Sequence, residues 1–329
     1  MPGPTLRVLF LNTYLLRVIE AEVGRHRLTL ASKPRVTERA EELGRALRGE
    51  YDVMALAEVF DERDLHSLLA AWPPGEAPLA HVGPVSTAAT VFQTSGLVTL
   101  VDGPAAGRVA VQGFTTRGSR VHDADAWAEK GALFCEVTVD GVTVELTSTH
   151  LLAGGGLIPR PPWVRHAGDA DRRAQVDELR AFVEQHHQPG NRQLVVGDFN
   201  VPATDAQGDE TDASRELRDA FDHLDDLWCR VGDQGPGPTA DIEEGTARFL
   251  TDTTDERFYL DAPAGESGAA ATASRSDRID YAFGSPDLEV VEFRRRRWPR
   301  PDDAAGLGEI DLMSDHVGLH LVLRVTSGQ

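Results

Sequence analysis

The chain has 329 residues, with 53 acidic and 33 basic side chains and a formal net charge of −20. This length is sufficient to bury a sizeable hydrophobic core, and no run of about 18 apolar residues, as a membrane-spanning helix requires, is present. The acidity counts against a protein that binds long nucleic acids, because such binding depends on basic surfaces that contact phosphates. The two cysteines, Cys135 and Cys229, are too few for a disulfide framework.

Six apolar, strand-like runs end in, contain or follow polar side chains that a strand does not need. In chain order, the runs and their polar residues are 6–11 with Asn12, 53–57 with Glu58, 142–149 with His150, 194–196 with Asp198 and Asn200, 278–283 with Asp280, and 317–323 preceded by Asp315 and His316. Carboxylate and amide oxygens suit Mg²⁺ or Mn²⁺, and histidines transfer protons near neutral pH. The pattern therefore predicts a metal-assisted site at the strand ends.

The tetrapeptide Gly197-Asp198-Phe199-Asn200 is the most specific of these strand ends. Residues i and i+2 of an extended segment point to the same side. We therefore expect Asp198 and Asn200 to face one site, with Phe199 turned into the core. An ordinary solvated turn is the alternative, because Asp and Asn are common turn residues.

The other predicted elements are helices, strands and loops in mixed order. We expect a helix begun by Thr37 as N-cap and closed by Gly49, a short helix after Asp61, two strands around the turn at 102–104, a hairpin with its turn at Asp140-Gly141, and helices over 170–187 and 209–227. The Gly- and Pro-rich segment 152–168, the segments 232–238 and 261–277, and the Arg-rich segment 292–313 are predicted to be loops.

Strands that occur in hairpins and also alternate with helices indicate an α/β fold with two packed sheets. The predicted fold is a four-layer α/β/β/α sandwich, in which two mainly antiparallel sheets pack face to face with helices outside. Because the polar residues are spread over nearly the whole chain, we expect one catalytic domain, 1–329.

The ordered set of motifs resembles the endonuclease/exonuclease/phosphatase superfamily of metal-dependent phosphoesterases. Gly-Asp-Phe-Asn at 197–200 and Ser-Asp-His at 314–316, with Glu58 and His150 between Asn12 and Asp198, make up the signature. This resemblance covers the chain from Asn12 to His316 and implies the same sandwich fold.

The resemblance also implies roles for the matching residues. Glu58 would be the principal Mg²⁺ ligand with help from Asn12, and Asp315 would hold this metal or a second ion. His316 would be the general base, paired with Asp280 or with the competing Asp277; Asp280 is preferred because it lies inside the predicted strand. Asp198 would orient the attacking water, Asn200 would donate to a phosphate oxygen, and His150 would donate to a non-bridging oxygen in the transition state.

Within the superfamily the chain is most similar to the bacterial neutral sphingomyelinases. The residues that carry this similarity are Asn12-Thr13-Tyr14-Leu15-Leu16, Glu58-Val59-Phe60-Asp61, Lys130-Gly131-Ala132-Leu133-Phe134, Ser148-Thr149-His150-Leu151 and the helix-like run 171–179. The substrate implied is a phosphodiester such as a lipid head group. The chain departs from the secreted bacterial enzymes in having no recognisable export signal and no aromatic membrane-contact hairpin.

Three alternatives remain open from the sequence. They are a nuclease for DNA or RNA, which the net charge disfavours, a phosphatase for inositol phosphates or another soluble phosphoester, and a non-catalytic binding module. Arg7, Lys130 and Arg278 are further candidates for phosphate contacts, although we expect them to be outward-facing strand residues. If Met1 is the natural start, we expect a cytoplasmic protein; a trimmed precursor would be secreted.

Overall fold

The computed structural model describes residues 4–15, 20–23, 26–29, 36–85, 94–118, 128–153, 167–205, 207–231, 239, 278–296, 298, 314 and 316–325.

The first β-sheet combines the two ends of the chain. It has the strand order β13-β14-β1-β4-β6-β5. The strands are β13 Glu289–Arg296, β14 Gly318–Arg324, β1 Thr5–Asn12, β4 Val53–Ala57, β6 Val98–Val101 and β5 Leu79–Val82. Only β1 and β4 pair in parallel.

The second sheet has the order β11-β12-β10-β9-β8-β7. Its strands are β11 Asp225–Asp226, β12 Asp280–Gly284, β10 Arg192–Asp198, β9 Val142–His150, β8 Gly131–Val139 and β7 Ala105–Gly113. Here only β9 and β10 pair in parallel. Each sheet is therefore mainly antiparallel, as predicted.

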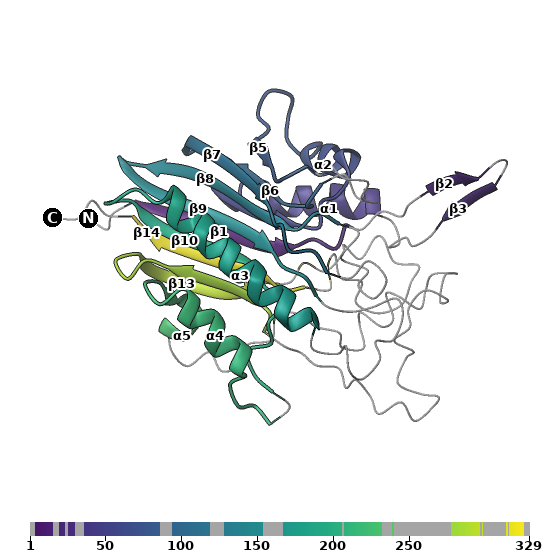
Figure 1. The fold of residues 1–329 in the computed structure, drawn as a ribbon. Helices are drawn as coiled ribbons and strands as arrows, with labels where there is room; N and C mark the ends of the chain where they lie inside the picture. The colour runs from purple at the N-terminus through teal and green to yellow at the C-terminus, as the bar shows by residue number, and fades with distance from the viewer. Residues whose placement is uncertain are drawn as a thin grey trace.

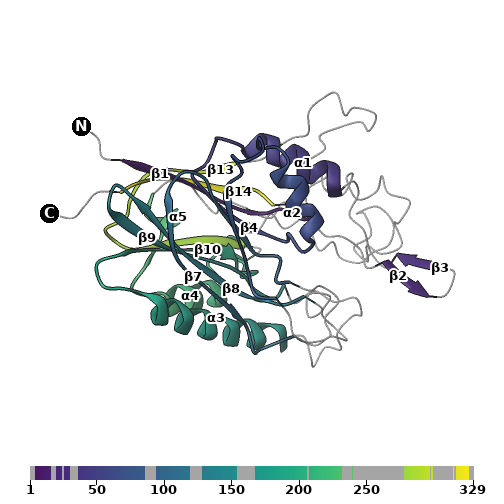
Figure 2. The same ribbon diagram turned by 90° about the horizontal axis from the view of Figure 1, so that it is seen from above.

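Helices cover the outer faces of both sheets, which gives the four layers visible in Figure 2. The helices are α1 Val36–Leu47 and α2 Glu62–Leu69 over the first sheet, and α3 Ala167–His186 and α4 Asp212–Ala220 over the second, with the short α5 Leu227–Arg230 beside β12. A small hairpin, β2 Glu20–Val23 with β3 His26–Thr29, projects away from the sandwich (Figure 1). No described helix is long and apolar enough to cross a membrane.

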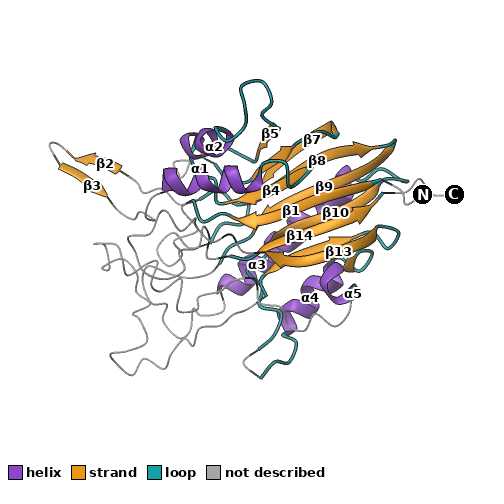
Figure 3. Ribbon diagram, turned by 180° about the vertical axis from the view of Figure 1, so that it is seen from behind, coloured by secondary structure: helices purple, strands orange, loops and turns teal. Residues whose placement is uncertain are grey.

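Alternation along the strands explains why the sheets pack in this way. In β1, Leu6, Val8 and Phe10 point into the core between the sheets, whereas Leu9 and Leu11 point outward beneath α1 and α2. Successive strand residues face opposite sides, so strands that are apolar on both faces form the two central layers. Figure 3 shows the first sheet from its outer side.

Several predicted elements are confirmed and three are corrected. Asp140 and Gly141 both have positive φ in the β8–β9 turn, at 48° and 80°, as a tight hairpin requires.

The helix predicted over 209–227 is shorter, because the chain turns after Ala220 and enters β11. The Arg-rich segment from 292 to 296 belongs to β13 and is not a loop. Thr37 lies inside α1 and is not its N-cap.

An aromatic cluster stabilises the layer between the second sheet and α4. Phe283 is fully buried; its ring stacks on Tyr281, with centroids 5.7 Å apart, and on Phe221 at 5.3 Å. We expect Phe283→Ala to lower the free energy of unfolding by about 3–5 kcal/mol, since it leaves a cavity in a close-packed core. Urea denaturation measures this change. The matched control Val291→Ala, at an exposed position of β13, should stay within about 0.5 kcal/mol; equal losses in both variants would contradict this view of the core.

Candidate functional site

The polar strand ends named above meet at one end of the sandwich, at the seam between the two sheets. The first sheet and its flanking loops contribute Asn12, Glu58 and His316, and the second sheet contributes three residues from adjacent strands. The pairing of β10 places Asp198 opposite His150 on one side and opposite Asp280 on the other. Sheet register alone therefore aligns these three side chains in a row.

Asn12 joins the two sheets through its side-chain amide. Its Nδ2 donates to Glu58 Oε1 at 3.1 Å and to Asp198 Oδ2 at 3.0 Å. The backbone N–H of Tyr14 donates to Asn12 Oδ1 at 3.1 Å, which fixes the orientation of the amide. Glu58 directly follows β4 and has φ 61°, a left-handed conformation that is rare outside glycine and concentrates at functional sites.

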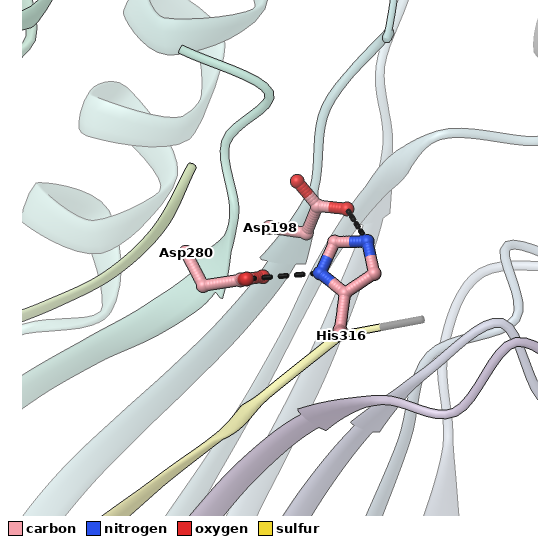
Figure 4. Close-up of side chains that lie close together, drawn as sticks. All are labelled: Asp198, Asp280 and His316. Atoms are coloured by element: carbon pink, nitrogen blue, oxygen red, sulfur yellow. Dashed lines mark hydrogen bonds and ion pairs between the residues drawn. The ribbon is translucent and has the colours of Figure 1, made fainter. Parts of the chain in front are cut away.

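His316 and Asp280 form a hydrogen-bonded pair across the seam. His316 Nδ1 lies 2.9 Å from Asp280 Oδ2, and Nε2 lies 3.7 Å from Asp198 Oδ2. Figure 4 shows the two carboxylates at the two nitrogens of the ring. Because the carboxylate of Asp280 accepts from Nδ1–H, the basic lone pair of the neutral imidazole is at Nε2.

Ser314 supports His316 from the side of the first sheet. Its hydroxyl donates to the carbonyl oxygen of Asn12 at 2.5 Å and accepts from the backbone N–H of His316 at 3.0 Å. The Ser-Asp-His motif therefore ties His316 to the end of β1. Asp315 and Asp277 lie outside the described residues.

Asn200 departs from its expected geometry. The strand ends at Asp198, and Asn200 has φ 52°, so it does not continue an extended segment. Its backbone N–H donates to Asp198 Oδ1 and its Nδ2 donates to the carbonyl oxygen of Leu151, both at 3.0 Å. Phe199 is buried in the core as predicted. Asn200 thus links the loop after His150 to the Asp198 turn.

Lys130 is a site residue whose burial the sequence did not indicate. It precedes β8, is buried rather than outward-facing, and places Nζ 3.0 Å from His150 Nε2. His150 Nε2 also lies 3.5 Å from Asp198 Oδ2. An ammonium group can only donate, so the contact places the proton of a neutral His150 on Nδ1. The register of β8 with β9, which pairs Gly131 with His150, is the signal that could have located Lys130.

The other two basic candidates are engaged elsewhere. Arg7 forms an ion pair with Asp52, at 2.7 Å, near the start of β1. Arg278 is buried, forms an ion pair with Asp226 at 3.0 Å and lies over the ring of Tyr281. Asp226 also caps α5, so Arg278 stabilises the edge of the second sheet.

The site has an excess of buried negative charge that a cation would balance. The pKa of Asp198 is raised to about 7, first because burial disfavours its charged form and then because Asp280 repels it. No described residue donates to the buried Oδ1 of Asp280. Asp198, Asp280 and His316 offer ligand atoms within 4.8 Å of one another, and Glu58 adds a further carboxylate. The carboxylate oxygens of this set are hard donors that fit a divalent ion such as Mg²⁺ or Mn²⁺.

We expect the buried Asp198 to reduce stability as pH rises in the metal-free protein. Its pKa lies above the ordinary value of 3.8 in the folded state, so between about pH 4 and pH 7 the unfolded chain releases a proton that the folded protein retains. The free energy of unfolding of the wild type should therefore fall with pH relative to that of Asp198→Asn. Denaturant titrations of both proteins across this pH range test the prediction. If the free energies of unfolding of the two proteins change with pH in parallel, the prediction is contradicted.

The sequence matches the model of the endonuclease/exonuclease/phosphatase family over residues 12–316. No curated protein sequence matches the chain. Among solved structures, sphingomyelinase C from Streptomyces griseocarneus is 20% identical, with a TM-score of 0.60 over 97% of this chain and 99% of that one.

Two further solved structures share the fold. A double mutant of beta toxin from Staphylococcus aureus with bound magnesium ions is 17% identical, with a TM-score of 0.61 over 97% and 99% of the two chains. TDP2 from D. rerio, in complex with a single-strand DNA product, is 15% identical, with a TM-score of 0.59 over 97% and 98%. At these identities the likeness shows the fold alone. The family match spans nearly the whole chain, and the protein therefore belongs to the endonuclease/exonuclease/phosphatase family of metal-dependent phosphoester hydrolases.

Proposed function

We propose that the protein is a Mg²⁺-dependent phosphodiester hydrolase of sphingomyelinase type, which releases the phosphocholine head group from a lipid. The observation that carries the proposal is the meeting of the His316–Asp280 pair with Asp198, Asn12 and Glu58 at one seam. We further propose that 1–329 acts as one catalytic domain, because this site draws on residues from both ends of the chain.

Glu58 is proposed as the principal ligand of Mg²⁺, with Asn12 beside it. A bound divalent ion neutralises charge on the phosphoryl group and on the leaving oxygen. Asn12 would hold Glu58 and Asp198 in place through the two hydrogen bonds of its amide. Asp315, the residue after Ser314 in the sequence, is proposed as an additional ligand of the metal.

His316 is proposed as the general base. Asp280 holds its Nδ1–H, so Nε2 is oriented toward Asp198 and the seam. As a water oxygen forms its bond to phosphorus, the water proton passes to Nε2. The bond from phosphorus to the leaving oxygen breaks, its electron pair stays on that oxygen, and the oxygen takes up a proton from solvent. Asp198, whose Oδ2 lies 3.7 Å from Nε2, would orient this water.

Lys130, together with His150 when both of its ring nitrogens are protonated, is proposed to stabilise the negative charge that develops on the phosphoryl oxygens. The Lys130 ammonium group supplies positive charge next to His150. Asn200 would donate to a phosphoryl oxygen on the same side, because it ties the Asp198 turn to the backbone that follows His150.

Two features favour a lipid head group as the substrate. The motifs Lys130-Gly131 and Ser148-Thr149-His150 resemble those of bacterial neutral sphingomyelinases. The net charge of −20 opposes binding of a long polyanion such as DNA. A nuclease is the second candidate, supported by the shared fold of a TDP2 that binds a DNA product.

The proposed base can be tested with a matched pair of histidine variants. We expect His316→Gln to lower turnover by about 100- to 10,000-fold, the range typical of general acid–base catalysis. His320→Gln is the control, since His320 lies in β14 and contacts Tyr51 on the outer face. Steady-state kinetics with saturating Mg²⁺ measures both. Near-wild-type turnover in His316→Gln would refute the assignment of the base.

The substrate is tested by incubating the protein with sphingomyelin vesicles and with plasmid DNA, each with Mg²⁺ or with EDTA. We expect phosphocholine release that requires Mg²⁺, with the plasmid left intact. Plasmid nicking without lipid turnover would identify a nuclease instead. If neither substrate is hydrolysed, both candidate functions are excluded, and small soluble phosphoesters become the substrates to test next.

A further inference from the structure

Among the residues that the structure describes, no strand pairs with the outer side of β12 at Asp280, where the site lies. β12 pairs with β10 along its whole length, but β11 pairs only with Phe283 and Gly284, at the far end of β12. The backbone N–H groups of Ile279 and Asp280 therefore require another acceptor, because buried N–H groups left unpaired are costly.

Thr239 supplies this acceptor. Its Oγ1 accepts from the backbone N–H of Ile279 and from that of Asp280, both at 3.0 Å. Its own carbonyl oxygen accepts from the backbone N–H of Val317 at 2.6 Å. Thr239 is fully buried, so its side chain is shielded from solvent.

These three bonds connect the two halves of the catalytic pair. Asp280 opens β12 in the second sheet, whereas Val317 follows His316 and leads into β14 of the first sheet. A single residue thus ties the backbone at Asp280 to the backbone next to His316, across the seam that their side chains also bridge.

We propose that Thr239 is a positioning residue that sets the distance and angle between Asp280 and His316. The inference rests on the proposed role of these two residues as the base pair of the hydrolase. The hydroxyl oxygen holds the backbone of Asp280, and the carbonyl oxygen holds that of Val317, so the Nδ1–Oδ2 distance of 2.9 Å depends on both. A misplacement of about 1 Å can reduce catalysis by about 100-fold.

Three variants separate this role from a general structural one. Thr239→Val keeps the shape of the side chain and the carbonyl oxygen but removes the hydroxyl. Thr239→Ser restores the hydroxyl. Ser285→Ala is the matched control, because Ser285 is also buried and its Oγ accepts from the backbone N–H of Gln193 at 2.6 Å, at the opposite end of the same pair of strands.

The first readout needs no substrate. In the metal-free wild type, we expect a downfield proton signal in the NMR spectrum from the His316 Nδ1–H that donates to Asp280. Thr239→Val should lose or shift this signal, whereas Thr239→Ser and Ser285→Ala should keep it. An unchanged signal in Thr239→Val, or an equal change in Ser285→Ala, would overturn the proposal.

The second readout is steady-state kinetics with Mg²⁺ and sphingomyelin. We expect kcat to fall by about 10- to 100-fold in Thr239→Val with little change in KM, and to recover in Thr239→Ser. An unchanged kcat in Thr239→Val would also overturn the proposal. If the wild type does not hydrolyse sphingomyelin, the proposed substrate fails, and the NMR signal alone decides the role of Thr239.

Discussion

The contacts between side chains of opposite sheets at the seam are the constraint on which the site depends. Asn12 reaches Asp198 from the first sheet to the second, and His316 reaches Asp280 in the same direction. Neither sheet contains the complete set of residues. The hydrophobic core between the sheets sets their separation, so packing far from the chemistry determines whether the polar atoms meet at hydrogen-bonding distance.

In the absence of a cation, this arrangement lowers the free energy of unfolding of the protein. Two carboxylates, Asp198 and Asp280, are buried next to each other, and the pKa of Asp198 is raised to about 7, mainly through burial and then through Asp280. Lys130 offsets part of the negative charge. Functional sites commonly retain such unfavourable groups because their chemistry needs them. A divalent ion bound at the site would relieve the repulsion between these carboxylates.

The sandwich fold, and the meeting of Asn12, Glu58 and Asp198 at one end of it, could be predicted from the sequence, because strand ends that carry unneeded polar groups are visible in its pattern. The sequence could not show that Asn200 adopts a left-handed conformation, since Asp-x-Asn also fits an extended strand. Lys130 was a candidate for a phosphate contact but was expected to face outward, because its burial follows from the pairing of β8 with β9. Thr239 was missed because its partners lie about 40 to 80 residues away, and no local pattern marks such a contact.

The central claim is that a divalent cation binds at the seam beside Glu58. A crystal structure of the protein with Mn²⁺, analysed by anomalous scattering, tests it most directly. The account predicts an anomalous peak within coordination distance of a Glu58 carboxylate oxygen, about 2.1 Å for an ion of this class, and no such peak in Glu58→Gln. A peak elsewhere in the wild type, with none beside Glu58, would contradict the account.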